Sequence, residues 1–442
     1  MNQFFAIAIC FLCGFTDVKI ADVQIAELVI IVAFGLSFLA PEKRLVLEGP
    51  SIILNFLPKF FILLMLLLAG SILSLRLQFF PVPDTGPLKQ PPFASLVRLI
   101  EVALSISSMF YVALSVRNRP DNLRKFLAAY VWAALIGSIW GMISFVLSYA
   151  GLELPGATPG TIPRICGFFV EGGPFGVYLV GAVIVQLVRG HYLGYVSKPT
   201  FLVQLAILVG ALVGTQSKAA VALIGAVAIV FLVKTRHFRL VVLMACAMVP
   251  VAFTSNLISG VQGYYQNYAN YQQAAAERPD DTSLIAGRLA AAVLLPRIVA
   301  KHPVLGVGIG NYALVRNDPA FLRGLPYLAI WDSPGLGLLG YLAELGIPLT
   351  LFVLWLYAYP LLQAWRSRPW IVLLCSYPVL AALFGVQLNF AYPWIIAGIG
   401  LATVAIDRQH HARLKTRAHL AKEQKSHPQK NSAQTPSAQT PN

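Results

Sequence analysis

Long and nearly uncharged apolar runs recur along the whole chain, and they constrain its fold more than any other feature. A helix needs about 20 mostly apolar residues to cross the hydrocarbon core of a bilayer. Only 12% of the 442 residues are charged, and 57% are hydrophobic; soluble globular proteins carry about 25% charged residues. The sequence therefore excludes the soluble, disordered and fibrous classes and predicts a polytopic membrane protein.

The apolar runs predict an all-α protein with about twelve transmembrane helices, because a backbone in lipid must satisfy its own hydrogen bonds. The expected spans are 3–16, 23–40, 51–72, 93–116, 124–149, 168–188, 200–214, 218–233, 239–257, 334–360, 370–386 and 389–406. The predicted units are helices 1–9 within 1–258, a long helical outer loop over 259–333, helices 10–12 within 334–406, and a basic tail over 407–442. We expect this tail to be disordered, because it becomes poor in apolar residues.

The net charge of +15 is the balance expected of a membrane protein whose cytoplasmic loops face anionic lipid, so nucleic acid is not an expected partner. With both termini placed in the cytoplasm, the inner loops hold most of the Lys and Arg residues of the short loops, as the positive-inside rule requires. The cysteines lie mostly inside apolar segments, and no ligand cluster accompanies them. We therefore expect no metal and no cofactor.

Two cations stand where apolar runs meet the expected outer face. Lys218 follows Ser217 between two runs, and it is either an interfacial lysine that reaches toward water or an anion contact beside the Ser217 hydroxyl. Arg288 follows Gly287 in the outer loop. It is either an ordinary arginine of an amphipathic helix or a phosphate ligand, since a guanidinium offers a bidentate fork.

Two carboxylates join these candidates. Glu171 and Arg164 bracket the outer entry to the sixth span, as a structural ion pair or as a functional carboxylate with a cation beside it. Asp332 precedes the tenth span. Its alternatives are a general base, a hydrogen-bond partner for a sugar, or a cap for the helix that follows.

Further candidates lie in the outer loop. Tyr264 and Tyr268 belong to a tyrosine-rich stretch that either stacks on sugar faces or anchors the chain at the interface. A helix is predicted from Ile285 to Ala300, and Arg297 is expected to share roughly the same side as Arg288, nine residues earlier. Residues 280–283 offer side chains that could cap this helix.

The sequence gives little support to other chemistries. There is no Asp-x-Asp pair, no Ser/His/Asp arrangement, and no Gly-Lys-Ser/Thr after the glycine run 306–310. Arg98 and Glu101 are the chief ionisable residues expected at midspan, and they could neutralise each other. A transporter would place its polar site at midspan, so transport stays as the alternative of another class.

In order along the chain, several of these segments resemble the O-antigen ligase and O-antigen polymerase superfamily. The matching stretches are Arg164–Glu171 with Tyr178-Leu179, Thr215–Lys218, Gly287-Arg288, Lys301–Tyr312 with its His-Pro-Val-Leu-Gly-Val-Gly run, and Glu344–Ile347. The resemblance covers about 160–350.

The resemblance implies a metal-independent glycosyltransferase of the bacterial inner membrane. In the family, the donor glycan is carried on undecaprenyl pyrophosphate at the outer face, an acceptor hydroxyl attacks its anomeric carbon, and the lipid pyrophosphate leaves. The positions matching Lys218 and Arg288 hold the pyrophosphate. Membrane lipids and a chain-length regulator are further candidate partners.

The chain departs from the ligases of the family where Trp331-Asp332-Ser333 stands, because these usually carry a histidine there. Lys218 also stands where arginine is common in the family. The missing histidine favours polymerisation of O-antigen or exopolysaccharide repeats, with Asp332 in the histidine's place. Ligation of glycan to lipid A-core or to protein is the alternative within the same family.

Overall fold

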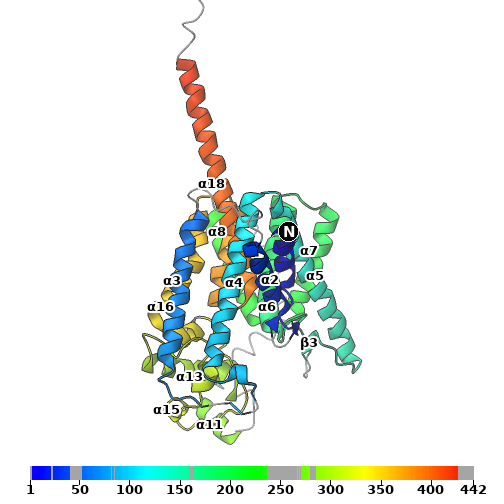
Figure 1. The fold of residues 1–442 in the computed structure, drawn as a ribbon. Helices are drawn as coiled ribbons and strands as arrows, with labels where there is room; N and C mark the ends of the chain where they lie inside the picture. Colours follow the sequence, from blue (N-terminus) through cyan, green and yellow to red (C-terminus); the bar gives the residue numbers. More distant parts are fainter. Residues whose placement is uncertain are drawn as a thin grey trace, which may run out of the picture.

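Helices make up nearly all the regular structure of the computed structural model (Figure 1). It describes residues 2–20, 23–39, 52–80, 82–83, 85–158, 163–235, 266, 268, 270–278 and 285–426. The described strands form two short antiparallel hairpins, β1 (Lys19–Ile20) with β2 (Val23–Gln24) and β3 (Ala157–Thr158) with β4 (Arg164–Ile165). The expected helical class is therefore confirmed.

The first half of the chain supplies a series of apolar helices. They are α1 (Asn2–Leu12), α2 (Ile25–Leu39), α3 (Ile52–Ser74), α4 (Phe93–Asn118), α5 (Asn122–Tyr149), α6 (Gly172–Leu187) with its π-helical extension η3 (Val188–Tyr192), α7 (Lys198–Gly214) and α8 (Lys218–Thr235). A short 3-10 helix, η2 (Pro87–Lys89), precedes α4. The second half adds α16 (Leu338–Ala364), α17 (Pro369–Leu383) and α18 (Ala391–Ser426).

Six of the described helices are long and apolar enough to cross a membrane, so the predicted twelve spans are not confirmed. The six segments are Ile52–Ser74, Phe93–Asn118, Asn122–Tyr149, Gly172–Tyr192, Lys218–Thr235 and Leu338–Ala364. The predicted span 239–257 lies outside the described residues, and every other predicted span falls on a helix. Several of these are apolar but short; α7, for example, ends at the 214–217 junction before α8 begins.

The tail does not follow the prediction over its first part. α18 continues through Ser426 (Figure 1), so the disorder expected from 407 onward is wrong for 407–426. The stretch is rich in Ala, Leu, Lys, Arg, Gln and Glu, which are strong helix formers even where no apolar face is buried. Residues 427–442 lie outside the described residues.

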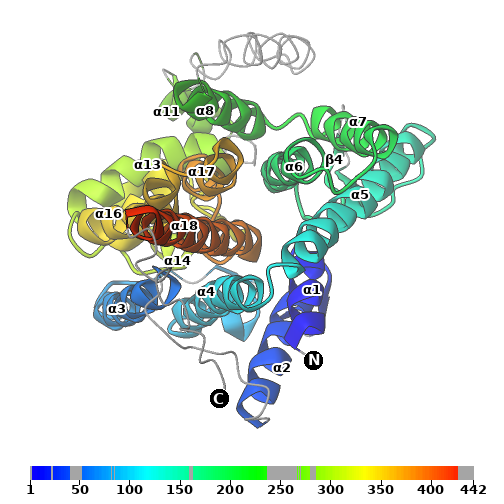
Figure 2. The same ribbon diagram turned by 90° about the horizontal axis from the view of Figure 1, so that it is seen from above.

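Helices distant in sequence pack around α18. α4 and α17 lie along it, and α16 packs against both α17 and α18 (Figure 2). Aromatic rings fill this core: Trp394 of α18 stacks on Tyr357 of α16, with 4.2 Å between ring centroids. Burial of large aromatic rings contributes strongly to packing, and it fixes the positions from which the loops emerge.

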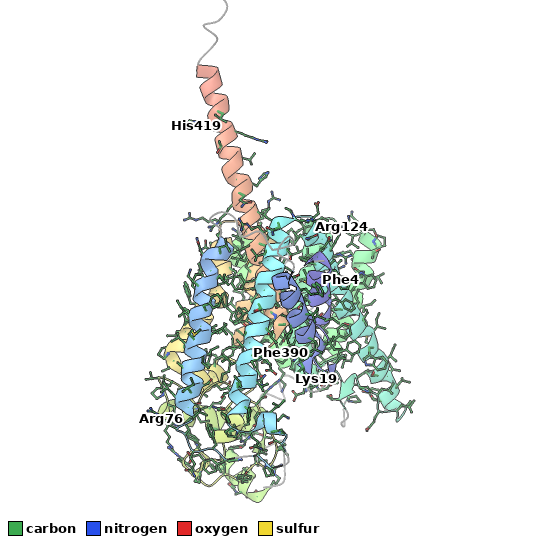
Figure 3. The ribbon with its side chains drawn as sticks, viewed as in Figure 1. Phe4, Lys19, Arg76, Arg124, Phe390 and His419 are labelled. Carbon is green, nitrogen blue, oxygen red and sulfur yellow. The ribbon has the colours of Figure 1, made fainter. Side chains whose placement is uncertain are left out.

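The helices between α8 and α16 form a second hydrophobic cluster at the end of the bundle opposite the α18 extension (Figure 1). They are α11 (Tyr271–Glu277), α13 (Gly287–Lys301), α14 (Tyr312–Val315) and α15 (Pro319–Leu322). Figure 3 places Lys19 and Arg76 toward the loop end, and Arg124 at the other end. This grouping agrees with the loop sides expected from the sequence.

Candidate functional site

A cavity of about 670 Å³ lies where the helices between α8 and α16 meet the rest of the bundle. Its wall comes from the β1–β2 hairpin, the start of α4, the start of α6, the start of α13, and the segments 331–335 and 384–392. Four charged side chains on the wall are central to the site, Arg98, Glu171, Arg288 and Asp332. The fold therefore gathers residues from distant parts of the sequence at one end of the bundle.

Arg288 reaches the cavity from the first turn of α13. Gly287 before it has φ +72°, a left-handed conformation that glycine adopts without steric cost. The guanidinium passes close to Gly173 of α6, where a β-carbon would lie 2.9 Å from Nη2. The absence of a side chain at Gly173 therefore makes room for Arg288.

Glu171 and Arg164 lie near Arg288. Glu171 is exposed on the cavity wall, at the residue before α6. Arg164 donates from Nε to the carbonyl of Thr215 at 3.0 Å. Burial lowers the pKa of the Arg164 guanidinium, the charge of Arg288 lowers it further, and Glu171 opposes both effects. The structure thus brings these three predicted residues together.

The junction between α7 and α8 has a structural role for Ser217. The buried Ser217 hydroxyl accepts the N–H of Ala220 and donates to the carbonyl of Gly173, both at 3.2 Å. It therefore caps α8 and joins α8 to α6. Lys218 is exposed as the first residue of α8; its neighbour Ala219 lines the cavity. A phosphate contact by Lys218 stays a prediction.

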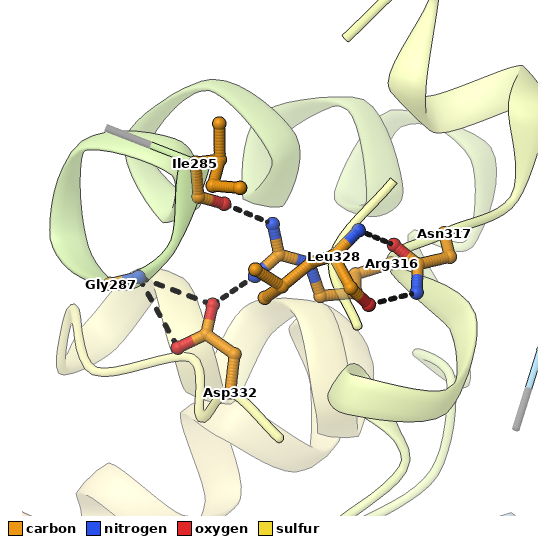
Figure 4. A network of polar contacts seen from close by, with 6 residues as sticks. All are labelled: Ile285, Gly287, Arg316, Asn317, Leu328 and Asp332. Atoms are coloured by element: carbon orange, nitrogen blue, oxygen red, sulfur yellow. Dashed lines mark hydrogen bonds and ion pairs between the residues drawn. The ribbon is translucent and has the colours of Figure 1, made fainter. Parts of the chain in front are cut away.

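Asp332 forms a buried network with Arg316 and the start of α13 (Figure 4). Its two carboxylate oxygens each lie 3.3 Å from the Gly287 nitrogen, and it forms an ion pair with Arg316. Burial raises the pKa of Asp332, although Arg316 and the N–H groups of Gly287 and Ser333 act in the opposite direction. The Asp332 carboxylate is therefore engaged within the protein at the edge of the cavity.

The capping interpretation of Asp332 is wrong for the helix that follows it. That helix, α16, has Gly337 at its N-cap and no side-chain cap. Asp332 instead accepts the N–H of the first residue of α13, far back along the chain. Of the capping candidates at 280–283, all lie outside the described residues, and the N-cap of α13 is Ala286.

Arg297 does not share the side of Arg288. Its Nη1 donates to the carbonyls of Phe321 and Leu322 at 2.6 and 2.9 Å, at the end of α15. The expectation was wrong because nine residues at 3.6 per turn place two side chains about half a turn apart. Tyr268 is 48% exposed, and neither it nor Arg297 belongs to the described cavity wall. Tyr264 lies outside the described residues.

Arg98 and Glu101 pair as predicted, with 2.8 Å between Nη1 and Oε2. They do not lie at midspan, because α4 begins at Phe93, and both line the cavity. Lys89 lies over the Trp331 ring, 5.6 Å from its centroid, and both residues also line the cavity.

Sequence reasoning missed Arg316 and the Lys89–Trp331 contact. Arg316 is only 2% exposed, and it follows the apolar stretch 312–315 in the sequence. An arginine directly after an apolar stretch was a signal for a buried partner. The identity of that partner, Asp332, depends on the tertiary fold.

Residues 203–356 match the family model described as O-antigen ligase, Wzy_C. This match supports the resemblance to the O-antigen ligase and polymerase superfamily over residues 203–356. The matched ligase segment contains Lys218, Arg288, Arg316 and Asp332, while Glu171 and the rest of the cavity wall lie partly outside it. No curated protein matches the chain. The family and the apolar helices together support membrane glycan processing of the ligase or polymerase type.

Proposed function

We propose that this protein polymerises undecaprenyl-pyrophosphate-linked oligosaccharide repeats at the outer face of the bacterial inner membrane. The observation that carries the proposal is the position of Arg288 beside Glu171 and Gly173 on a cavity at the loop end of the bundle. A cation and a carboxylate on one wall suit transfer from a lipid pyrophosphate, because the cation stabilises the leaving group and the carboxylate accepts a proton.

The proposed reaction forms one glycosidic bond and breaks another bond at the same carbon. The hydroxyl oxygen of the acceptor sugar attacks the anomeric carbon of the donor. The bond between that carbon and the pyrophosphate oxygen breaks, and its electron pair leaves with undecaprenyl pyrophosphate. Arg288 stabilises the negative charge that develops on the pyrophosphate. Lys218, next to Ala219 on the cavity wall, is proposed as a second contact to the pyrophosphate.

Two carboxylates on the cavity wall are candidates for the proton acceptor. Asp332 is already bound by Arg316 and by the Gly287 N–H, whereas Glu171 is exposed to the cavity. We therefore assign the hydroxyl proton to Glu171. Trp331, with Lys89 over its ring, offers an aromatic face on which a sugar can stack.

The second candidate is ligation of a finished glycan to lipid A-core or to protein, which the ligase description of the matched segment favours. The two reactions share the donor and the leaving group, and they differ in the acceptor. The open cavity wall at residues 384–392 and the β1–β2 hairpin, both outside the matched segment, are where an acceptor would be distinguished.

Reconstitution in vesicles with one lipid-linked repeat as both donor and acceptor tests the proposal. Polymerisation gives a ladder of products that grow by one repeat and remain lipid-linked. A single transfer that requires added lipid A-core or protein would indicate ligation. Movement of the intact repeat across the vesicle membrane, without lengthening, would indicate transport and overturn the proposal.

A further inference from the structure

We propose that Arg316 and Asp332 form a backbone clamp that sets the position of Arg288. The inference rests on the proposed function in one respect, namely that Arg288 binds the lipid pyrophosphate. Neither member of the clamp needs to touch the substrate. Both are positioning residues, and they act through the three residues that precede Arg288.

The two side chains bind the backbone at Ile285 and at Gly287 (Figure 4). Arg316 donates from Nη2 to the carbonyl of Ile285 at 2.6 Å, and its Nη1 pairs with Asp332. The Asp332 carboxylate then accepts the N–H of Gly287. A carbonyl and an N–H two residues apart are therefore fixed by one ion pair, directly before Arg288.

This part of the chain needs an external restraint. Gly287 is at φ +72° and has wide conformational freedom. The N-cap of α13 is Ala286, which has no side-chain acceptor for the first N–H groups of the helix. The Asp332 carboxylate supplies that acceptor, and its negative charge is favourable at a helix N-terminus. The clamp thus restrains the flexible Gly287 and supplies the hydrogen-bond acceptor that the Ala286 side chain lacks.

The burial of this ion pair indicates that it fixes the local geometry more than it adds to the free energy of unfolding. The side chains of Arg316 and Asp332 are 2% and 9% exposed, and taking both charges out of water offsets much of their attraction. Within the described part of the chain, Arg316 Nε lacks a hydrogen-bond partner. A buried ion pair with this desolvation cost is expected where it holds a specific arrangement. Here that arrangement is the approach of Arg288 to the cavity.

The clamp is tested first without any ligand, by hydrogen exchange of the amides at 287–290 in the purified full-length protein. Arg316→Lys keeps the charge but loses the fork that joins Ile285 to Asp332. Asn317→Ala is the matched control, because Asn317 is equally buried and bonds both the N–H and the carbonyl of Leu328 instead. We expect about tenfold faster exchange in Arg316→Lys and in Asp332→Asn, relative to Asn317→Ala. Equal exchange in all three variants would overturn the clamp.

A double-mutant cycle tests the consequence for Arg288, with undecaprenyl pyrophosphate as the binding probe. Arg316→Lys should weaken binding about tenfold or more in the parent, and it should have little further effect in an Arg288→Ala background, because coupled residues are not additive. Equal weakening in both backgrounds would overturn positioning through Arg288. If the parent itself failed to bind undecaprenyl pyrophosphate, the proposed function would fall, and the exchange experiment would still decide the clamp.

Discussion

The Arg288 guanidinium lies against the backbone of Gly173, so that a β-carbon on Gly173 would be 2.9 Å from Nη2. Gly173 is the second residue of α6, two positions after Glu171. The contact joins α13, which carries the proposed leaving-group ligand Arg288, to the start of α6, where the proposed proton acceptor Glu171 is the N-cap. The space for the cation is therefore part of the site.

Gly173→Ala should reduce glycan transfer more than it reduces stability. The new methyl group meets the far end of a flexible side chain, which can move, so the free energy of unfolding should stay within about 1 kcal/mol of the parent. The displaced guanidinium should lower the transfer rate about tenfold, because small misplacements at a reacting centre are costly. Gly210→Ala in α7 is the control, because among the described residues no atom outside the local helix backbone and the two chain neighbours lies within 4 Å of the added carbon. Parental rates in Gly173→Ala would contradict the proposed position of Arg288.

Lys218 is exposed, so its predicted contact with the pyrophosphate has to be tested by substitution. If its amine contacts the pyrophosphate, Lys218→Ala should lose most product at an unchanged protein level, by about 10²–10³-fold for a lost electrostatic donor. Lys218→Arg should retain more activity, since the charge survives. Lys198, which begins α7, offers a matched lysine for Lys198→Ala, and polymer yield per unit protein is the measurement. Yields that are equal in Lys218→Ala and Lys198→Ala would remove Lys218 from the site.

Ser217→Ala should act on stability rather than on catalysis. The hydroxyl accepts the Ala220 N–H as the cap of α8, and loss of such a cap costs about 1 kcal/mol. Ser217→Asp, which can also cap, should recover part of the loss in thermal unfolding. A large fall in turnover without any change in unfolding would instead support the predicted role of Ser217 in substrate binding.

Asp332 gives a pH dependence with a defined sign. Burial raises its pKa above the ordinary value of 3.8, so the folded state binds this proton more tightly than the unfolded state does. The contribution of Asp332 to the free energy of unfolding therefore falls as pH rises from 3.8 through the folded-state pKa. The difference in melting temperature between parent and Asp332→Asn, measured across acid pH, should show this slope. The opposite slope would mean that Arg316 outweighs burial.

The same substitution tests whether Asp332 has any role in the reaction. Protonation of Asp332 removes the charge that pairs with Arg316, so turnover of the parent should fall on acidification as the clamp loosens. Asp332→Asn should already be slow at neutral pH and should lack this acid limb. Full activity in Asp332→Asn would contradict both a general-base role and a positioning role for Asp332.

Local features of the sequence predicted the helices well. The apolar run at 51–72 became α3, and the run at 124–149 became α5 with nearly the same bounds. Hydrophobic length is a property of neighbouring residues, and so it can be read without the fold. The helical extension of α18 shows the limit of this rule, because helix propensity can continue a helix beyond its apolar segment.

The candidate site could be predicted only in part, because its contacts join residues that are distant in sequence. The chemistry of Arg288 and Glu171 made them candidates, and the fold placed both on the cavity. The partner of Asp332 and the true direction of Arg297 depended on how α13 packs. Such contacts follow from tertiary structure rather than from spacing along the chain.

The most direct test of the central claim is a single-turnover assay of the reconstituted protein with the lipid-linked repeat, comparing the parent with Arg288→Ala and Arg288→Lys. Formation of each glycosidic bond should release one undecaprenyl pyrophosphate. We expect a lipid-linked ladder from the parent, a loss of about 10²–10³-fold in Arg288→Ala, and partial recovery in Arg288→Lys, which keeps the charge but not the fork. A ladder of normal length and rate from Arg288→Ala would contradict it.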